Sequence, residues 1–309
     1  MGVWGTGLYS GDFALDLRAT IGAVVHLPFD PDRLVEILCD TEPSAANNPD
    51  NQEHSTFWLV VADQFAKRGI VCDRARERAL QIIDGAEDID MLEKLDMKPS
   101  DIRRRRKLLL EVRARIATTS VSRPRTVLKK PQPLLLDVGD VIVYPTCEGK
   151  CLNPYYLSKE LNKRYTRNGP LPWTQDGWGA AAIVDCGRAF EFLSWYRPLT
   201  LAAAKNEKPE LDLLRGDVLW RLELPGTCSL SHFKKMELER IGCLPLDPEK
   251  IKQRLPELRP GISAAVSNIS IANRLSAIPH AGSRAAPKSE GGAQGRTPTL
   301  YGIEQILKD

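Results

Sequence analysis

The 309-residue sequence lacks any apolar run long enough to span a membrane, and its first residues lack a basic start followed by an apolar stretch. We therefore expect a cytoplasmic protein that makes no membrane contact. A large excess of one charge is also missing, since 43 Lys and Arg face 40 Asp and Glu. A net charge of +3 gives no general reason to expect a nucleic-acid partner, so local charge matters more. Length and composition suit one large or two modest globular domains.

Metal-binding and nucleophile motifs are also missing. The odd number of cysteines, seven, and the length of the chain favour reduced thiols. Cys147 and Cys151 are close enough to share a metal, but no second close pair of Cys or His accompanies them. Cys228 precedes His232 by four residues, which leaves a thiol enzyme as an alternative, although an ordinary helix start is the favoured interpretation of the pair. We therefore expect no enzyme activity, no cofactor and no metal.

The first 120 residues are predicted to form a small bundle of helices. Asp30 can cap a helix whose first position holds Pro31. Residues 41–54 are rich in Pro, Asn and Asp and are predicted to be a loop, after which a helix runs to Gly69. Further helices are expected from Asp73 and, after Pro99, over a long segment that carries many arginines.

The pattern changes after a basic, proline-containing stretch. Short β-like runs appear at 134–144, 180–185, 189–195 and 218–224, separated by turns such as Glu148-Gly149. The sequence therefore predicts an α+β protein, with a helical bundle followed by a β-rich domain that contains inserted helices. The predicted segments are a helical domain (1–120), a linker (121–133), a β-rich domain (134–259) with helices at 155–165 and 231–240, a disordered tail (260–299) and a docking helix (300–309).

Two features suggest a binding surface. Lys98 to Lys130 is the most basic segment and could hold an acidic protein or phosphates, although a solvated helix face explains it as well. Tryptophans are concentrated in the β-rich domain, where they could form recognition anchors or pack in the core. The candidate partner-binding residues are Arg103, Arg104, Arg105, Arg106, Trp173, Trp178 and Trp195.

The glycine-rich N-terminus is a candidate structural motif. Neither a preceding strand nor a following Lys-Ser or Lys-Thr is present, so a nucleotide-binding phosphate loop is excluded. We expect Trp4 to insert into the domain, with Gly5 and Gly7 allowing the backbone to turn around its ring. Asp12 is then expected to begin the first helix.

The opening Met1-Gly2-Val3-Trp4-Gly5-Thr6-Gly7, with Asp12 and Asp16 after it, resembles the start of a bacterial family of unknown function, domain-of-unknown-function family 4259. From about Leu136 the chain resembles SH3-like immunity proteins of bacterial polymorphic toxin systems, the twenty-sixth such family. Gly139-Asp140-Val141 is similar to a first strand of that fold, and Trp178-Gly179-Ala180 is similar to a second.

These resemblances imply a non-enzymatic protein that binds and neutralises a toxin or defence effector. An inhibitor of that kind needs a shaped surface, aromatic anchors and complementary charge. The alternative is a nucleic-acid-associated protein in which residues 98–130 bind phosphates. Such a protein would lose affinity steeply as salt rises.

Overall fold

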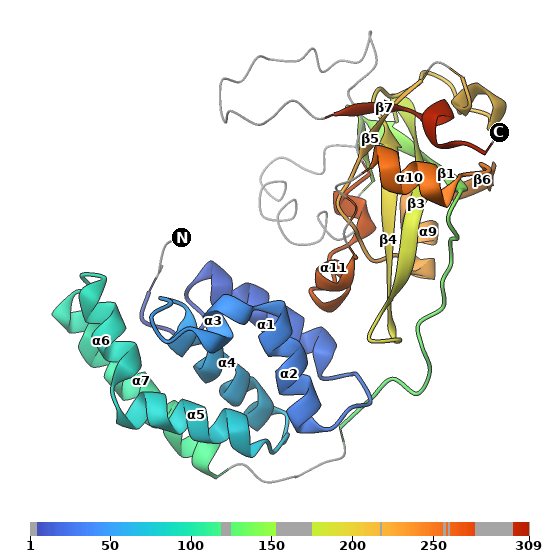
Figure 1. The fold of residues 1–309 in the computed structure, drawn as a ribbon. Coiled ribbons are helices and arrows are strands. Elements are labelled where there is room, and N and C mark those ends of the chain that lie inside the picture. The colour runs from blue at the N-terminus through green and yellow to red at the C-terminus, as the bar shows by residue number, and fades with distance from the viewer. Residues whose placement is uncertain are drawn as a thin grey trace. The chain divides into compact units, whose positions relative to one another are not determined.

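The computed structural model describes residues 5–118, 125–152, 175–216, 218–255, 258, 260–275 and 299–308. The chain forms two compact units (Figure 1). The helical unit comprises Met1–Lys130 with Val266–Asn268, and the sheet unit comprises Pro131–Ala265 with Ile269–Asp309. The N-terminal helices precede the strands along the chain, so the predicted α+β class is confirmed.

Local sequence signals define several helices of the helical unit. The Asp30 side chain accepts a hydrogen bond of 2.9 Å from the Arg33 backbone N–H, and Pro31 occupies the first helical position, as predicted. Gly69 lies two residues after a helix that ends at Lys67, and it has a left-handed φ of 65°. The helices are α1 (Asp12–Val24), α2 (Pro31–Thr41), α3 (Pro43–Asn47), α4 (His54–Lys67), α5 (Asp73–Asp84), α6 (Glu87–Lys94) and α7 (Pro99–Ala117).

The predicted loop at 41–54 is wrong in its first half, because α3 lies within it. Polar contacts to α4 hold this short helix in place. The buried imidazole of His54 bonds through Nδ1 to the Ala45 carbonyl at 2.7 Å, and Trp58 Nε1 donates to the Ala46 carbonyl at 3.1 Å. Tertiary contacts therefore override a composition that is typical of turns.

Helix α4 is the centre of the helical unit. It contacts α1, α3, α5, α6 and α7, and nearly every side chain from His54 to Phe65 is buried. The buried set includes four polar residues, His54, Ser55, Asp63 and Gln64. A helix that is enclosed on all sides places polar groups inside the protein, where they need hydrogen-bonding partners.

The end of the predicted linker is attached to the helical unit. The Leu128 backbone N–H donates to the His26 carbonyl at 2.7 Å, and the Arg125 guanidinium donates to the carbonyls of Leu27 and Phe29. On the other side of the unit boundary, the Gln132 backbone N–H donates to the Phe192 carbonyl at 2.9 Å. Residues 121–124 of that prediction lie outside the described residues.

The sheet unit is built on an antiparallel sheet. Its strands have the order β2-β1-β3-β4-β5-β7, and β6 pairs with the first part of β1, along the same edge as β2. Tyr144 pairs with Gly179, and Ala182 pairs with Leu199, which sets the register of the central strands. The strands are β1 (Asp140–Cys147), β2 (Lys150–Cys151), β3 (Gly177–Ala189), β4 (Leu193–Leu201), β5 (Leu219–Leu222), β6 (Glu239–Cys243) and β7 (Leu300–Gly302).

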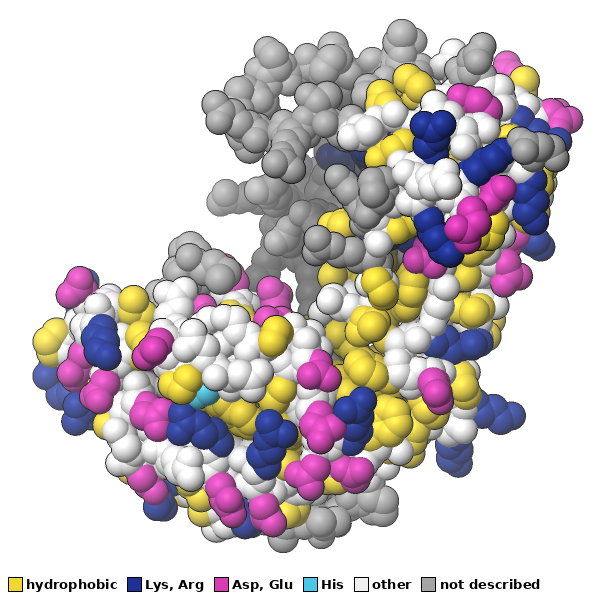
Figure 2. Space-filling view, in the orientation of Figure 1, with side chains coloured by type: hydrophobic (Ala, Val, Ile, Leu, Met, Phe, Trp, Pro, Cys, Tyr) yellow, Lys and Arg dark blue, Asp and Glu magenta, His cyan; other side chains and the backbone are white. Residues whose placement is uncertain are grey.

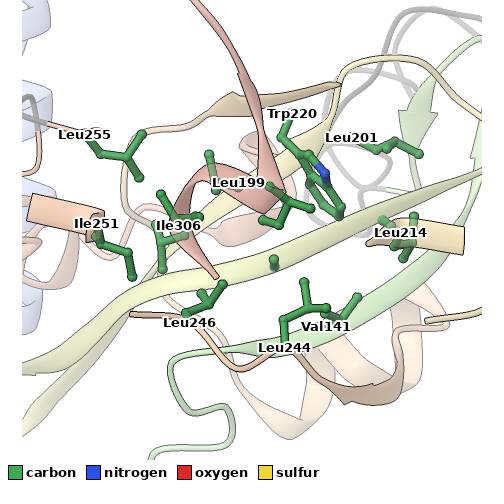
Figure 3. Close-up of a cluster of buried hydrophobic side chains, with 14 of the residues drawn as sticks. Val141, Leu199, Leu201, Leu214, Trp220, Leu244, Leu246, Ile251, Leu255 and Ile306 are labelled. Atoms are coloured by element: carbon green, nitrogen blue, oxygen red, sulfur yellow. The ribbon is translucent and has the colours of Figure 1, made fainter. Parts of the chain in front are cut away.

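Both faces of the sheet are covered. On one face, Val141, Leu199 and Trp220 pack with Ile251 and Ile306 (Figure 3). On the other face a second cluster includes Ile142, Tyr144 and Tyr196. Every residue of β4 is buried, as expected for a central strand between two cores. The helical elements after β1 are η2 (Asp212–Leu214), α9 (Leu230–Met236), α10 (Pro248–Arg254), α11 (Ile262–Val266), η3 (Ile271–Asn273) and η4 (Ile303–Ile306).

Local predictions in this unit have mixed outcomes. Glu148 and Gly149 form the predicted turn between β1 and β2, with φ of 52° and 73°. The helix predicted at 231–240 is shorter, because α9 ends at Met236 and strand β6 begins at Glu239. Its cap is Ser229, whose backbone N–H donates to His232 Nδ1 at 3.0 Å. The helix predicted at 155–165 lies outside the described residues.

The predicted disordered tail at 260–299 is wrong for its first part. Residues 260–275 include α11 and η3, and Ile271 and Leu275 are buried in the second core cluster. Residues 276–298 lie outside the described residues. The predicted docking helix at the C-terminus begins instead as strand β7, which pairs with β5 and leads into η4.

Candidate interaction surface

Helix α7 carries the predicted basic surface and divides it into two faces. Its inner face holds Ile102, Leu109, Val112 and Ile116, all buried. Positions three and four apart share a face of a helix, so the residues that point away from this set form an outer face. We define the α7 outer face as Arg103, Arg106, Lys107 and Leu110, all exposed; the exposed Glu111 lies beside them, four residues after Lys107.

Arg105 belongs to the inner face, so its prediction as a partner-binding residue is wrong. Its buried guanidinium forms two hydrogen bonds of 2.9 Å with Asp88 of α6, and it also donates to the Thr6 carbonyl. The spacing of Ile102 and Leu109 places Arg105 with them, and this period could have identified it. Arg105 therefore connects α7 to α6 and to the N-terminal loop.

Acidic residues balance much of the remaining charge of α7. Arg104 pairs with Asp101 at 3.5 Å, and Arg106 pairs with Glu93 at 3.4 Å. Arg113 pairs with Asp84, and this contact lowers the pKa of the carboxyl. Basic and acidic side chains are interspersed over the face of the helical unit seen in Figure 2. A continuous field of one sign, which phosphate tracking requires, is therefore interrupted.

An apolar side chain lies among the cations of the α7 outer face. Leu110 is 64% exposed, and Lys107 lies three residues before it on the same side of the helix. Within the part of the chain that the structure describes, Arg103 and Lys107 form no ion pair. The α7 outer face thus offers positive charge and an exposed apolar side chain together.

The tryptophans predicted as anchors have different environments. Trp195 is buried, so its prediction as an exposed anchor is wrong; a Cβ added to Gly261 would lie only 2.4 Å from its ring, so only glycine fits there. Trp178 is half-buried against the core, and the Lys208 ammonium lies 5.7 Å from its ring centroid. Trp173 lies outside the described residues. Trp178 remains a candidate contact residue.

The N-terminal motif forms a tight loop before α1. A Cβ added to Gly7 would lie 2.7 Å from Ser10 Oγ, so a larger residue there would require the Ser10 hydroxyl to move. Gly5 is also close to Ser10, and Asp12 begins α1, as predicted. Trp4 lies outside the described residues, so its predicted insertion into the domain stays a prediction.

The geometry around Cys228 does not resemble an activated nucleophile. The His232 nitrogens lie 2.8 Å from the hydroxyls of Ser229 and Ser270, and the Cys228 thiol donates to the Ser229 carbonyl. Burial raises the pKa of Cys228 to about 12, so the thiol is protonated at neutral pH. Cys151 has a pKa raised to about 12 by the same cause. Among the described residues, no three His, Cys, Asp or Glu side chains are placed to hold a metal.

The sequence analysis missed a polar cluster around Asp63. This carboxylate is fully buried in α4, and it accepts hydrogen bonds from Tyr9 Oη and from Arg115 Nε of α7. Lys67 Nζ lies 2.6 Å from the same carboxylate. Its signal in the sequence is an acidic residue inside an otherwise apolar stretch of helix. A buried charge is stable only with partners, so such a residue indicates a site.

Comparisons with family models, with curated proteins and with solved structures found no match to this chain. The resemblances to a family of unknown function and to SH3-like immunity proteins therefore stay predictions. Among the described residues, no helix combines the length and apolar character needed to cross a lipid bilayer.

Proposed function

We propose that this protein acts by binding an acidic protein, through the α7 outer face, and that it neutralises a toxin or effector as an immunity protein does. The observation that carries the proposal is the exposure of Leu110 among Arg103, Arg106 and Lys107. An apolar anchor with a rim of charge suits protein recognition, because the anchor supplies affinity and the rim supplies orientation and speed of association.

The composition of α7 favours a protein partner over nucleic acid. Nucleic-acid binding without base readout needs uninterrupted cations or stacking aromatics. On α7, acidic residues pair with Arg104, Arg106 and Arg113, and none of the α7 outer face residues is aromatic. Trp178 of the sheet unit is a second candidate contact in this proposal.

The proposal is tested with the purified products of the genes adjacent to the one that encodes this chain. Complex formation is measured by size-exclusion chromatography with nuclease treatment, and protection is measured as growth when a toxic neighbour is co-expressed. The wild-type protein is expected to form a complex and restore growth. Arg103→Glu with Lys107→Glu should abolish both effects, since like charges repel the acidic partner.

Two comparisons make the result specific. Leu110→Ala should weaken the complex without changing its salt dependence, whereas Lys252→Glu on α10 of the sheet unit should have no effect. Complex formation that survives the α7 charge reversal would refute this surface. Recovery of nucleic acid that is lost at raised salt would instead support the nucleic-acid alternative.

A further inference from the structure

The pocket beside Asp63 has a volume of about 330 Å³ and lies where the N-terminal loop meets α4 and α7. Gly7 to Ser10 form one wall of this open pocket, and Asp63 and Lys67 of α4 and Arg115 of α7 line another part of it. The pocket belongs entirely to the helical unit. It is separate from the α7 outer face, because Arg115 points to a different side of the helix.

The pocket is cationic although it contains a carboxylate. Asp63 is fully buried, and each of its oxygens is engaged, one by Arg115 Nε at 2.7 Å and the other by Tyr9 and Lys67. Lys67 and Arg115 keep 41% and 39% of their side chains exposed. Asp63 therefore orients two cations that are both partly exposed to solvent.

Further cations surround the same tyrosine. The Arg18 guanidinium lies 5.4 Å and the Lys67 ammonium 4.8 Å from the Tyr9 ring centroid. Arg68 donates to Gln64, which in turn donates to Tyr9 Oη. Four basic side chains thus lie around one carboxylate, so the cluster carries an excess of positive charge that an added anion would offset.

The rest of the pocket indicates the size and kind of anion. Leu8, Leu108 and Val112 supply an apolar wall beside the charged end. Lysine and arginine together suit phosphate oxygens, one as a point charge and the other as a planar donor. Glycine in the neighbouring loop leaves room for close approach.

We propose that this pocket binds a small phosphate monoester, with the phosphate at Lys67 and Arg115 and the carbon skeleton against Leu108 and Val112. This inference does not depend on the proposed protein partner. It also differs from a nucleotide-binding phosphate loop, whose spacing the N-terminus lacks. Here the side chains that Asp63 orients supply the recognition.

The test is titration of the full chain with phenyl phosphate and with inorganic phosphate at constant ionic strength. Binding is measured by calorimetry and by broadening of the ³¹P resonance of each probe. The wild-type protein is expected to bind phenyl phosphate more tightly than inorganic phosphate, because only the ester reaches the apolar wall. Absence of a saturable signal from either probe at millimolar concentration would overturn the proposal.

Matched variants at one position locate the site without breaking its ion pairs. Leu108→Gln and Leu108→Glu have similar size, and only the second adds a negative charge at the pocket. We expect the Glu variant to bind phenyl phosphate more weakly than the Gln variant by a factor on the order of ten. Equal affinity of the two variants would refute this location.

A second comparison distinguishes phosphate binding in the pocket from non-specific phosphate binding to other basic side chains. Arg103→Gln with Arg106→Gln removes two cations from the α7 outer face and should leave phenyl phosphate affinity unchanged. Lys67→Gln should abolish binding, and circular dichroism verifies that this variant remains folded. Loss of binding in the outer-face variant would show that the phosphate binds there instead.

Discussion

At the residue scale, the main finding is that consecutive arginines of α7 lie in different environments. Arg103, Arg104, Arg105 and Arg106 are consecutive, yet only Arg105 is buried. Its two hydrogen bonds to Asp88 satisfy both charges inside the protein. Breaking a buried pair by removing one partner leaves a buried charge without compensation, which costs far more than loss of an exposed pair.

We predict that Asp88→Asn lowers the free energy of unfolding by about 3–5 kcal/mol, because Arg105 then stays buried without a counter-charge. Urea unfolding followed by circular dichroism measures the change. The double variant Asp88→Leu with Arg105→Met should recover much of the loss, since no buried charge remains. Equal stability of Asp88→Asn and the wild-type protein would show that the pair is not structurally important.

At the element scale, the signals that were predictable from the sequence are local ones. Asp30 caps α2 as predicted, and Asp247 caps α10 in the same way, because a side chain three residues or fewer from its partner N–H groups needs no tertiary context. The Glu148-Gly149 turn follows from the same kind of local chemistry. Predicted and observed elements agree where neighbours along the chain determine the structure.

The elements that were mispredicted depend on contacts with distant residues. Residues 260–275 are rich in Ala, Ser and Asn, but they also hold five branched apolar side chains. Gly261 fits against Trp195, and Ile271 lies in the core with Tyr196. The site at Asp63 is of the same kind, since Tyr9 is 54 positions away and Arg115 is 52 positions away. Periodicity indicates which helix face is apolar, but not which distant side chain approaches a buried charge.

We predict that the C-terminal segment stabilises the sheet unit. Ile303 and Ile306 are buried in the core of one sheet face, and β7 pairs with β5. Ile306→Ala should lower the free energy of unfolding by about 2–5 kcal/mol, because it leaves a cavity beside Ile251 and Trp220. Leu300→Ala on β7, where the side chain is 43% exposed, is the control and should have a smaller effect. Equal effects would show that η4 does not pack in solution as described.

At the scale of the whole molecule, each unit has a core of its own. The core of the helical unit surrounds α4, and the two clusters of the sheet unit lie on the faces of its sheet. Units that bury separate cores can unfold separately, so a single two-state transition is not expected for the full chain.

We therefore predict two transitions in calorimetric unfolding of the full chain. Asp88→Asn should lower the midpoint of one transition by several degrees, and Ile306→Ala should lower the other, because each substitution damages one core only. A single transition that both variants shift together would contradict this prediction and would show that the cores unfold as one. If the transitions are separate, phenyl phosphate should raise only the midpoint that Asp88→Asn lowers, since a ligand stabilises the unit that binds it. The same scan thus assigns the phosphate pocket to the helical unit by an observable independent of affinity.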